Sequence, residues 1–309
     1  MAIYDYQGNP ISSGGGSQFV SVSDFGATGD GTTDDATAIQ SALDSLSTSG
    51  GIIYFPVGTY KVCTMLHYNS KQTLWFENGA TLRAGASGMG CIIGAKVDTT
   101  ITGYNGVHDV LIHGGTFDGS SFSSNILLFG TVHSQNIEFD GCSFVGAFGL
   151  AHNLEINSSK NVRIHNCVFT RGTNVGQDAE MIQIDRASYG AYVEPINEDN
   201  TNCSYIDIYD CTFGPNAASP GVGNHSGTPD IVNVHDNFFI DFTGNRGAID
   251  LASTNLSIYN NVFSGCTIGV GSSGATHYIH DNRFIGVTTA TAGETSVVHN
   301  NLVNGTFIA

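Results

Sequence analysis

Residues 161–169 read NVRIHNCVF, and six further segments repeat this pattern of alternating apolar residues, a polar turn and a final phenylalanine. Successive phenylalanines are 21 to 27 residues apart, except for one step of 44. The other copies are DVLIHGGTF (109–117), NIEFDGCSF (136–144), YIDIYDCTF (205–213), IVNVHDNFF (231–239), NLSIYNNVF (255–263) and HYIHDNRF (277–284). A period of this length is typical of a solenoid, in which each coil packs on the next.

One column of the repeat indicates how the coils stack. Two residues before each phenylalanine the chain carries a small residue or an asparagine: Gly115, Cys142, Cys167, Cys211, Asn237, Asn261 and Asn282. At a turn, such residues can share hydrogen bonds along the stack. A second apolar strand precedes each copy, so we predict an all-β, single-stranded parallel β-helix with two strands per coil. The three cysteines are then buried structural residues rather than reactive thiols.

The N-terminal third follows a different pattern, which predicts a helix that caps the first coil. Its apolar face consists of Ile39, Leu43 and Leu46, and Thr33 or Asp34 can cap its start. An uncapped β-helix end would expose unpaired backbone groups, so a capping helix is physically expected there.

Composition excludes several classes of function. Acidic residues number 27 against 10 basic ones, which gives a net charge of −17 and leaves no basic face for nucleic acid. The first residues lack the pattern of a signal peptide, and the longest apolar run is too short to cross a bilayer. We therefore expect no nucleic-acid partner, no membrane insertion, and one β-helix domain over residues 18–309 after a flexible segment of residues 1–17.

The 44-residue step indicates a long loop over roughly residues 187–204. This loop carries Tyr189 and Tyr192 among several acidic residues. Long loops on a rigid scaffold often contact ligands, and we expect both tyrosines to bind substrate. The alternative is a surface loop without a binding role.

Two N-terminal segments carry a family resemblance. DFGATGDGTTDDATAIQSAL (24–43) and GGIIYFPVGTYKV (50–62) resemble the signature of the pectate-lyase-like superfamily, which includes phage tailspikes and polygalacturonases. The resemblance implies a right-handed parallel β-helix that acts on polysaccharide. The first sixteen residues are similar to phage tail proteins, which implies a place on a virion tail or outside the cell and a homotrimer. The Arg-x-Lys motif of polygalacturonases is absent, which argues against galacturonan as the substrate.

Candidate site residues lie in the strands that precede the repeat copies. Histidines recur in one repeat column, at His113, His165, His235, His280 and His299, where Tyr and Asp also occur, so we interpret this column as structural. In the preceding strands, unlike polar residues point outward from neighbouring coils by period two. The proposed catalytic residues are Glu155, Asp185, Glu180 and His225. The proposed substrate-binding residues are His152, Asn157, Gln183, Arg186, Arg246 and Asp250, together with the two loop tyrosines.

Coil spacing predicts the chemistry of this strip. Glu155 and Asp185 stand one coil and two residues apart, about 8 Å, which suits an inverting glycosidase. Asp185 and His225 are predicted to be direct neighbours that form a hydrogen-bonded pair. We expect an endo-acting hydrolase of a bacterial surface or extracellular polysaccharide, without cofactor or metal. The alternatives are a uronic-acid lyase or epimerase, which could require Ca²⁺, and a non-catalytic receptor-binding module.

Overall fold

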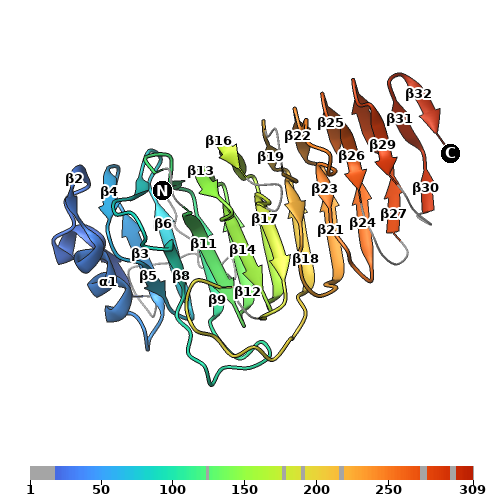
Figure 1. The fold of residues 1–309 in the computed structure, drawn as a ribbon. Coiled ribbons are helices and arrows are strands. Elements are labelled where there is room, and N and C mark those ends of the chain that lie inside the picture. Colours follow the sequence, from blue (N-terminus) through green and yellow to red (C-terminus); the bar gives the residue numbers. More distant parts are fainter. Residues whose placement is uncertain are drawn as a thin grey trace.

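The chain folds into a right-handed parallel β-helix of three long sheets (Figure 1). The computed structural model describes residues 18–122, 125–175, 179–188, 192–215, 219–271, 277–292 and 297–308. Residues 1–17, predicted to be flexible, and Tyr189, predicted to bind substrate, lie outside the described residues. Within the described residues, no helix is long and apolar enough to span a membrane.

The three sheets run the length of the solenoid. The first sheet holds β1 (Phe19–Ser21), β3 (Gly51–Phe55), β6 (Gln72–Phe76), β9 (His108–His113), β12 (Gln135–Asp140), β15 (Lys160–His165), β18 (Ser204–Tyr209), β21 (Asp230–His235), β24 (Leu256–Tyr259), β27 (His277–His280) and β30 (Val297–His299). The second holds β2 (Asp30–Asp34), β4 (Thr59–Val62), β7 (Thr81–Ala84), β10 (Thr116–Asp118), β13 (Ser143–Gly149), β16 (Val168–Val175), β19 (Thr212–Phe213), β22 (Phe238–Ile240), β25 (Val262–Ser264), β28 (Arg283–Ile285), β31 (Asn301–Val303) and β32 (Thr306–Ile308). The third holds β5 (Leu66–Tyr68), β8 (Cys91–Ala95), β11 (Leu127–Val132), β14 (Leu154–Asn157), β17 (Ile182–Asp185), β20 (Val222–Gly223), β23 (Ile249–Asp250), β26 (Ile268–Gly271) and β29 (Thr289–Ala292).

Each coil contains three strands, so the prediction of two strands per coil is wrong. Every repeat copy spans a corner between two sheets: in residues 161–169, β15 ends at His165 and β16 begins at Val168. The final phenylalanine therefore belongs to the second sheet. A turn of two residues, with Asn166 at a φ of 55°, separates the strands. Sequence alternation continues across this turn, which is why the two strands look like one.

Phenylalanines of the second sheet form the centre of the core. The rings of Phe144, Phe169, Phe213, Phe239 and Phe263 stack on one another with centroids 4.7 to 5.0 Å apart, and all five are fully buried. Each repeat thus places the same ring above its neighbour, which fixes the register between coils.

The corner column forms the predicted ladder. Asn237, Asn261, Asn282 and Asn301 are buried, and the side-chain amide nitrogen of each of the first three donates to the side-chain oxygen of the next at 3.0 Å. The cysteines at the same corner are buried and free, as predicted for Cys142, Cys167 and Cys211.

Breaking the ladder should destabilise the fold. We expect Asn261→Ala to lower the free energy of unfolding by about 2 to 3 kcal/mol, because the Val234 carbonyl and the Asn237 amide lose buried partners. Urea unfolding followed by circular dichroism measures the change. Asn233→Ala, on the outer side of β21, is the control and should change stability by less than ~0.5 kcal/mol. Equal effects of the two substitutions would contradict the ladder's structural role.

The histidine column is structural, as predicted. Along the first sheet His165, Tyr209, His235, Tyr259 and His280 stack with centroids 4.6 to 5.3 Å apart and almost parallel planes. Repeated stacking accounts for the exchange of His and Tyr at this position.

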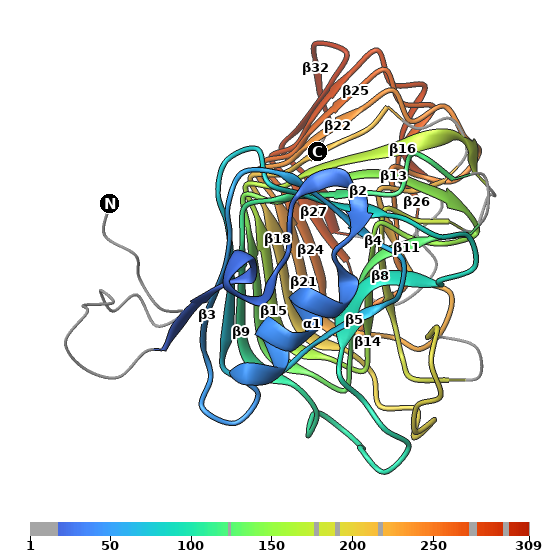
Figure 2. The same ribbon diagram turned by 90° about the vertical axis from the view of Figure 1, so that its left-hand side faces the viewer.

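Helix α1 (Ala36–Ser45) covers the N-terminal end of the coils, preceded by the short 3₁₀ helix η1 (Val22–Phe25), as the view along the axis shows (Figure 2). The predicted apolar face is buried at Ile39, Leu43 and Leu46. The N-cap residue is Asp35 rather than Thr33 or Asp34. The Asp35 carboxylate instead accepts hydrogen bonds from the turn at Thr28 and Gly29, while Asp34 accepts one from the Ala36 amide.

Strand β32 pairs antiparallel with β31, the last parallel strand of the second sheet. The sequence analysis did not foresee this hairpin, because residues 306–308 do not match the repeat.

Candidate active site

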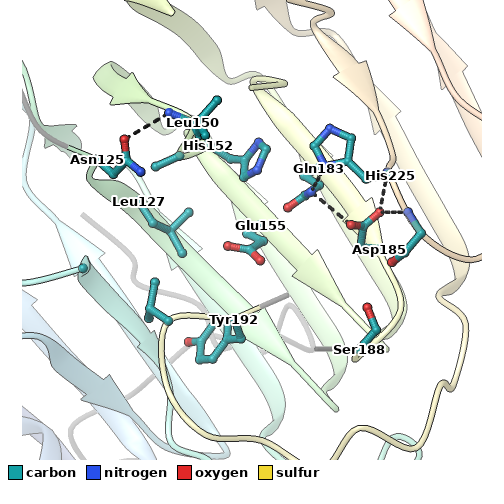
Figure 3. A pocket seen from close by; sticks show the side chains of 14 residues that line it. Asn125, Leu127, Leu150, His152, Glu155, Gln183, Asp185, Ser188, Tyr192 and His225 are labelled. Carbon is teal, nitrogen blue, oxygen red and sulfur yellow. Dashed lines mark hydrogen bonds between the residues drawn. The ribbon is translucent and has the colours of Figure 1, made fainter. Parts of the chain in front are cut away.

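A pocket of about 580 Å³ lies on the outer face of the third sheet, over β11, β14 and β17 (Figure 3). Six residues predicted to form the catalytic or binding site line it: Glu155, Asp185, His225, His152, Gln183 and Tyr192. The register is the predicted one, since Glu155 pairs with Gln183 and Asn157 with Asp185. Glu155 and Asp185 are therefore one coil and two residues apart, about 8 Å. Both carboxylates face the same pocket.

Glu155 is the buried acid of the pocket. Its side chain is 6% exposed, and the Asn157 amide donates to one of its oxygens at 2.8 Å. Burial raises the pKa of Glu155 to about 8, because removing water disfavours the charged form. At neutral pH this carboxyl group therefore carries a proton that it can donate.

Asp185 is held in a more polar environment. Its Oδ1 accepts hydrogen bonds from the backbone amides of His225 and Ser226 at 2.8 and 2.9 Å, and its Oδ2 accepts one from Gln183 at 3.0 Å. Burial raises the pKa of Asp185, but these three donors favour the ionised form. The two carboxyl groups thus differ in environment, as an acid and a base should.

The His225 ring pairs with Glu180 and not with Asp185, which corrects the predicted pairing. His225 Nε2 lies 2.8 Å from Glu180 Oε2, and the Gln183 amide donates to His225 Nδ1 at 2.7 Å. Only the backbone of His225 contacts Asp185. The hydrogen bond with Glu180 raises the pKa of His225. The register of the strands was predicted correctly, but strand register does not determine the rotamer of His225, which turns its ring away from Asp185 towards Glu180.

Glu180 is fully buried behind the pocket and does not line it. Arg246 lies 3.0 Å from its other oxygen and also contacts Asp250 at 2.5 Å. Although burial opposes ionisation, the His225 hydrogen bond holds the pKa of Glu180 below its usual value. Glu180, Arg246 and Asp250 form a charged cluster beside the His225 ring, and none of the three lines the pocket.

Arg171, which the sequence analysis did not identify, supports the edge of the pocket. Its guanidinium donates to the backbone carbonyls of Ala151 and Ala179 at 2.7 and 2.6 Å. Burial lowers the pKa of Arg171 to about 10 and that of nearby His152 to about 4. His152 is therefore neutral at pH 7, and its Nδ1 lies 3.0 Å from the carbonyl oxygen of Glu180.

His152, Glu180 and His225 place their ligand atoms within 4.8 Å of one another, a spacing that could hold a metal ion. All three were predicted as site residues from the sequence, but not as a set of metal ligands. Both Glu180 oxygens already pair with Arg246 and His225, and His152 Nδ1 pairs with a backbone carbonyl. A metal would have to displace these partners, so we assign the group to positioning His225.

The long loop forms a strap along the N-terminal side of the pocket. We call residues 192–203 the strap. Tyr192 is buried against β8 and β11, and a side chain at Gly94 or Gly130 would collide with its ring. Glu194 pairs with His67 on β5 at 2.9 Å. Figure 1 shows this segment running back towards the N-terminal coils. Tyr192 is thus a wall of the pocket, and its contact with substrate stays a prediction.

The remaining predicted residues lie outside the pocket lining. Asn157 donates a hydrogen bond to Glu155 and does not line the pocket itself, and Arg186 does not line it either. Eight lining residues were not predicted from the sequence, because they are apolar or lie outside the strands of the third sheet: Gly90, Asn125, Leu127, Leu150, Ala151, Ser188, Val193 and Ser226.

The buried Glu155 should make stability depend on pH. Its folded pKa lies above its unfolded value, so its stabilising contribution is present below about pH 4.5 and is lost as pH rises towards about 8. We expect Glu155→Gln to have a free energy of unfolding a few kcal/mol higher than the wild type at pH 8, and so a higher unfolding temperature, and to match the wild type at pH 4. Thermal unfolding at both pH values measures this. Glu198→Gln, at an exposed position, should show no such difference, and a pH-independent effect of Glu155→Gln would contradict the burial argument.

Comparison with known proteins places the fold in a family. Residues 19–294 match the model of the family described as "Rhamnogalacturonase A/epimerase, pectate lyase-like". The chain belongs to this family. Its members share the β-helix, but this description covers more than one reaction, so the activity follows from the site.

Individual relatives have different roles. Plasmin and fibronectin-binding protein A of Streptococcus pneumoniae is 27% identical over 262 residues, 71% of this chain and 36% of that protein. The structure of this adhesin, PfbA, superposes with a TM-score of 0.76 at 20% identity, covering 93% of this chain and 80% of that one. The structure of an exopolygalacturonase from Thermotoga maritima superposes with a TM-score of 0.58 at 16% identity, covering 92% of this chain and 79% of that one. The structure of ORF18 of Geobacillus virus E2 superposes with a TM-score of 0.59 at 18% identity, covering 92% of this chain and 59% of that one.

Proposed function

We propose that the protein is a glycoside hydrolase that cleaves a bacterial surface or extracellular polysaccharide with inversion of configuration. The observation that supports this most strongly is the pair of unlike carboxyl groups in one pocket. Glu155 is buried beside a single amide donor, whereas Asp185 accepts three hydrogen bonds. Their backbone positions are about 8 Å apart, and a carboxyl separation of that size would leave room for a water molecule, as inverting glycosidases require.

In this mechanism Glu155 donates its proton to the glycosidic oxygen as the bond to the anomeric carbon breaks. Asp185 accepts a proton from a water molecule, and the water oxygen bonds to the anomeric carbon from the opposite face. Asp185 is left protonated and Glu155 ionised, and exchange with solvent restores both. His225 and Gln183 orient Asp185, through a backbone amide and a side-chain amide.

Incubation with a panel of neutral and acidic bacterial polysaccharides tests the reaction class. We expect new reducing ends without the ultraviolet absorbance of the double bond that a lyase creates, and the same rate in EDTA. Absorbance that rises with the reducing ends, or activity that EDTA abolishes, would indicate the lyase alternative with Ca²⁺. Rearranged uronic acids without cleavage would indicate an epimerase.

An adhesin is the second candidate, because the relative at 27% identity is named for binding plasmin and fibronectin. This function predicts binding of a glycan or protein without any cleavage. It also predicts that binding survives Glu155→Gln and Asp185→Asn together, while no variant or wild-type protein releases reducing ends.

We further propose that the protein acts outside the cell or on a phage virion tail, as a homotrimer, without nucleic-acid partners. The fold resemblance to a surface adhesin and to a phage protein supports this location. Light scattering of the purified chain tests the oligomeric state, and a monomeric mass at micromolar concentration would contradict the trimer.

A further inference from the structure

We propose that the strap closes one end of the substrate groove, so that the enzyme removes one or two sugars from a chain end. This inference rests on the proposed hydrolase function. It replaces the expectation of an endo-acting enzyme.

The closure begins directly beside Glu155. Along the sheet, Gly94, Gly130 and Glu155 occupy paired positions on β8, β11 and β14. Glycine at the first two positions leaves room for the Tyr192 side chain, because a Cβ would lie 2.6 Å from the Tyr192 ring at Gly130 and would collide with the Tyr192 hydroxyl oxygen at Gly94. We call a set of paired positions across neighbouring strands a row. In the row that contains Glu155, Tyr192 therefore forms a wall only one coil from Glu155, ~4.8 Å away.

The pocket extends further in the neighbouring rows, but it ends at the strap there as well. Its lining reaches Gly90 at the start of β8, where Val193 of the strap would lie 3.5 Å from a Cβ. From β14 to β8 is two coil spacings, ~10 Å, which is room for one or two sugar rings. A polysaccharide that continued in this direction would meet the strap.

The strap is built as a fixed wall. Its Tyr192 belongs to a small apolar cluster on the outer face of the sheet, with Cys91, Leu127, Val132 and Ala187. Further along, the Asn197 carbonyl oxygen lies 2.8 Å from His133 Nε2, and Asp199 accepts a hydrogen bond from the Gly103 amide. These contacts tie the strap to two earlier coils, so it forms a wall without needing a ligand to order it.

The other side of the catalytic pair differs. There the row of Glu155 continues through Gln183 to Gly223 and Asp250 on β20 and β23. The Glu180 side chain fills the space over Gly223, and Asp250 lies half-buried against Arg246. On this side the pocket instead reaches the exposed His225 and its neighbour Ser226. We assign this side to the remainder of the polysaccharide chain.

The closed end also limits which sugar it accepts. Its described lining residues are Gly90, Asn125, Leu127, Leu150, Ala151, Tyr192 and Val193, none of which is charged. A uronate carboxylate would lose its hydration there without a cationic partner, at a considerable cost in free energy. The terminal sugars should therefore be neutral, and their apolar faces would pack on Leu127, Leu150 and Tyr192.

Product size tests the inference, measured on any polysaccharide of the panel that the wild type cleaves. Reducing ends and weight-average molar mass are followed together by size-exclusion chromatography with light scattering. We expect mono- or disaccharides from the first time point, with molar mass falling only in proportion to the sugar released. A collapse of molar mass at low conversion would overturn the inference and leave the hydrolase intact. If no glycan of the panel yields reducing ends, both the closed groove and the proposed hydrolase function are contradicted.

Variants of the strap provide a second readout. Tyr192→Ala should open the wall and shift products from one or two sugars to a broader range of oligosaccharides. Tyr205→Ala, on the first sheet and half-exposed, is the matched control and should leave the product pattern unchanged. Val193→Gly, at a 43% exposed position, should broaden the products too if Tyr192→Ala fails to fold. Wild-type product patterns from folded strap variants would contradict the inference.

Discussion

Glu155→Gln is expected to lower the rate of polysaccharide cleavage by about 10² to 10⁴-fold, because the amide cannot donate the proton that the leaving oxygen needs. The substitution keeps the size of the side chain, so the Asn157 contact and the pocket shape can remain. Binding of uncleaved glycan should therefore be retained. This separates a catalytic role from a purely structural one.

Initial rates of reducing-end release measure this effect, with affinity for the same polysaccharide measured in parallel. In the wild type, the rate should fall as pH rises through about 8, where Glu155 loses its proton. The residual rate of Glu155→Gln should not show this fall at high pH, because the variant has no carboxyl proton to lose. Glu198→Gln, at an exposed position, should match the wild type. A folded Glu155→Gln protein that cleaves at the wild-type rate would exclude Glu155 as the acid.

Phe239→Ala is expected to lower the free energy of unfolding by about 3 to 5 kcal/mol. Phe239 is fully buried and stacks between Phe213 and Phe263, with centroids 4.7 and 5.0 Å away. Removing it leaves a cavity in the ring column and deprives two neighbouring coils of contact. Because coils in a solenoid contact only their neighbours, the loss should concentrate at this point of the stack.

The adjacent residue supplies a matched control. Phe238 lies on the same strand, β22, but its side chain points outward and is 52% exposed. Phe238→Ala should change stability by about 0.5 kcal/mol or less. Denaturant unfolding of both variants measures the difference. Similar losses of stability in the two variants would show that the stacked phenylalanine column does not contribute more to stability than an exposed phenylalanine.

The repeat predicted the solenoid because identical positions in successive coils face identical environments. The phenylalanine and asparagine columns follow directly from that, as does the pairing of Asn157 with Asp185. The corner inside each copy was missed, because alternation of apolar residues continues across a two-residue turn such as that at Asn166.

Side-chain direction and loop paths could not be predicted in the same way. The His225 ring turns to Glu180, a choice of rotamer that spacing along a strand does not determine. Glu155 lies next to the strap along the sheet, and the path of the strap depends on Tyr192 meeting Gly94 and Gly130 from distant coils. Leu127 and Leu150 line the pocket for the same reason, and an apolar residue in a strand gives no sign of such a role.

The central claim is that Glu155 and Asp185 hydrolyse a glycosidic bond with a water molecule between them. Proton NMR of the first sugar that the wild-type protein releases tests it most directly, before the anomers equilibrate. We predict the anomer opposite in configuration to the bond cleaved, and no vinyl proton. A product of retained configuration, or the vinyl proton of an unsaturated sugar, would contradict the mechanism.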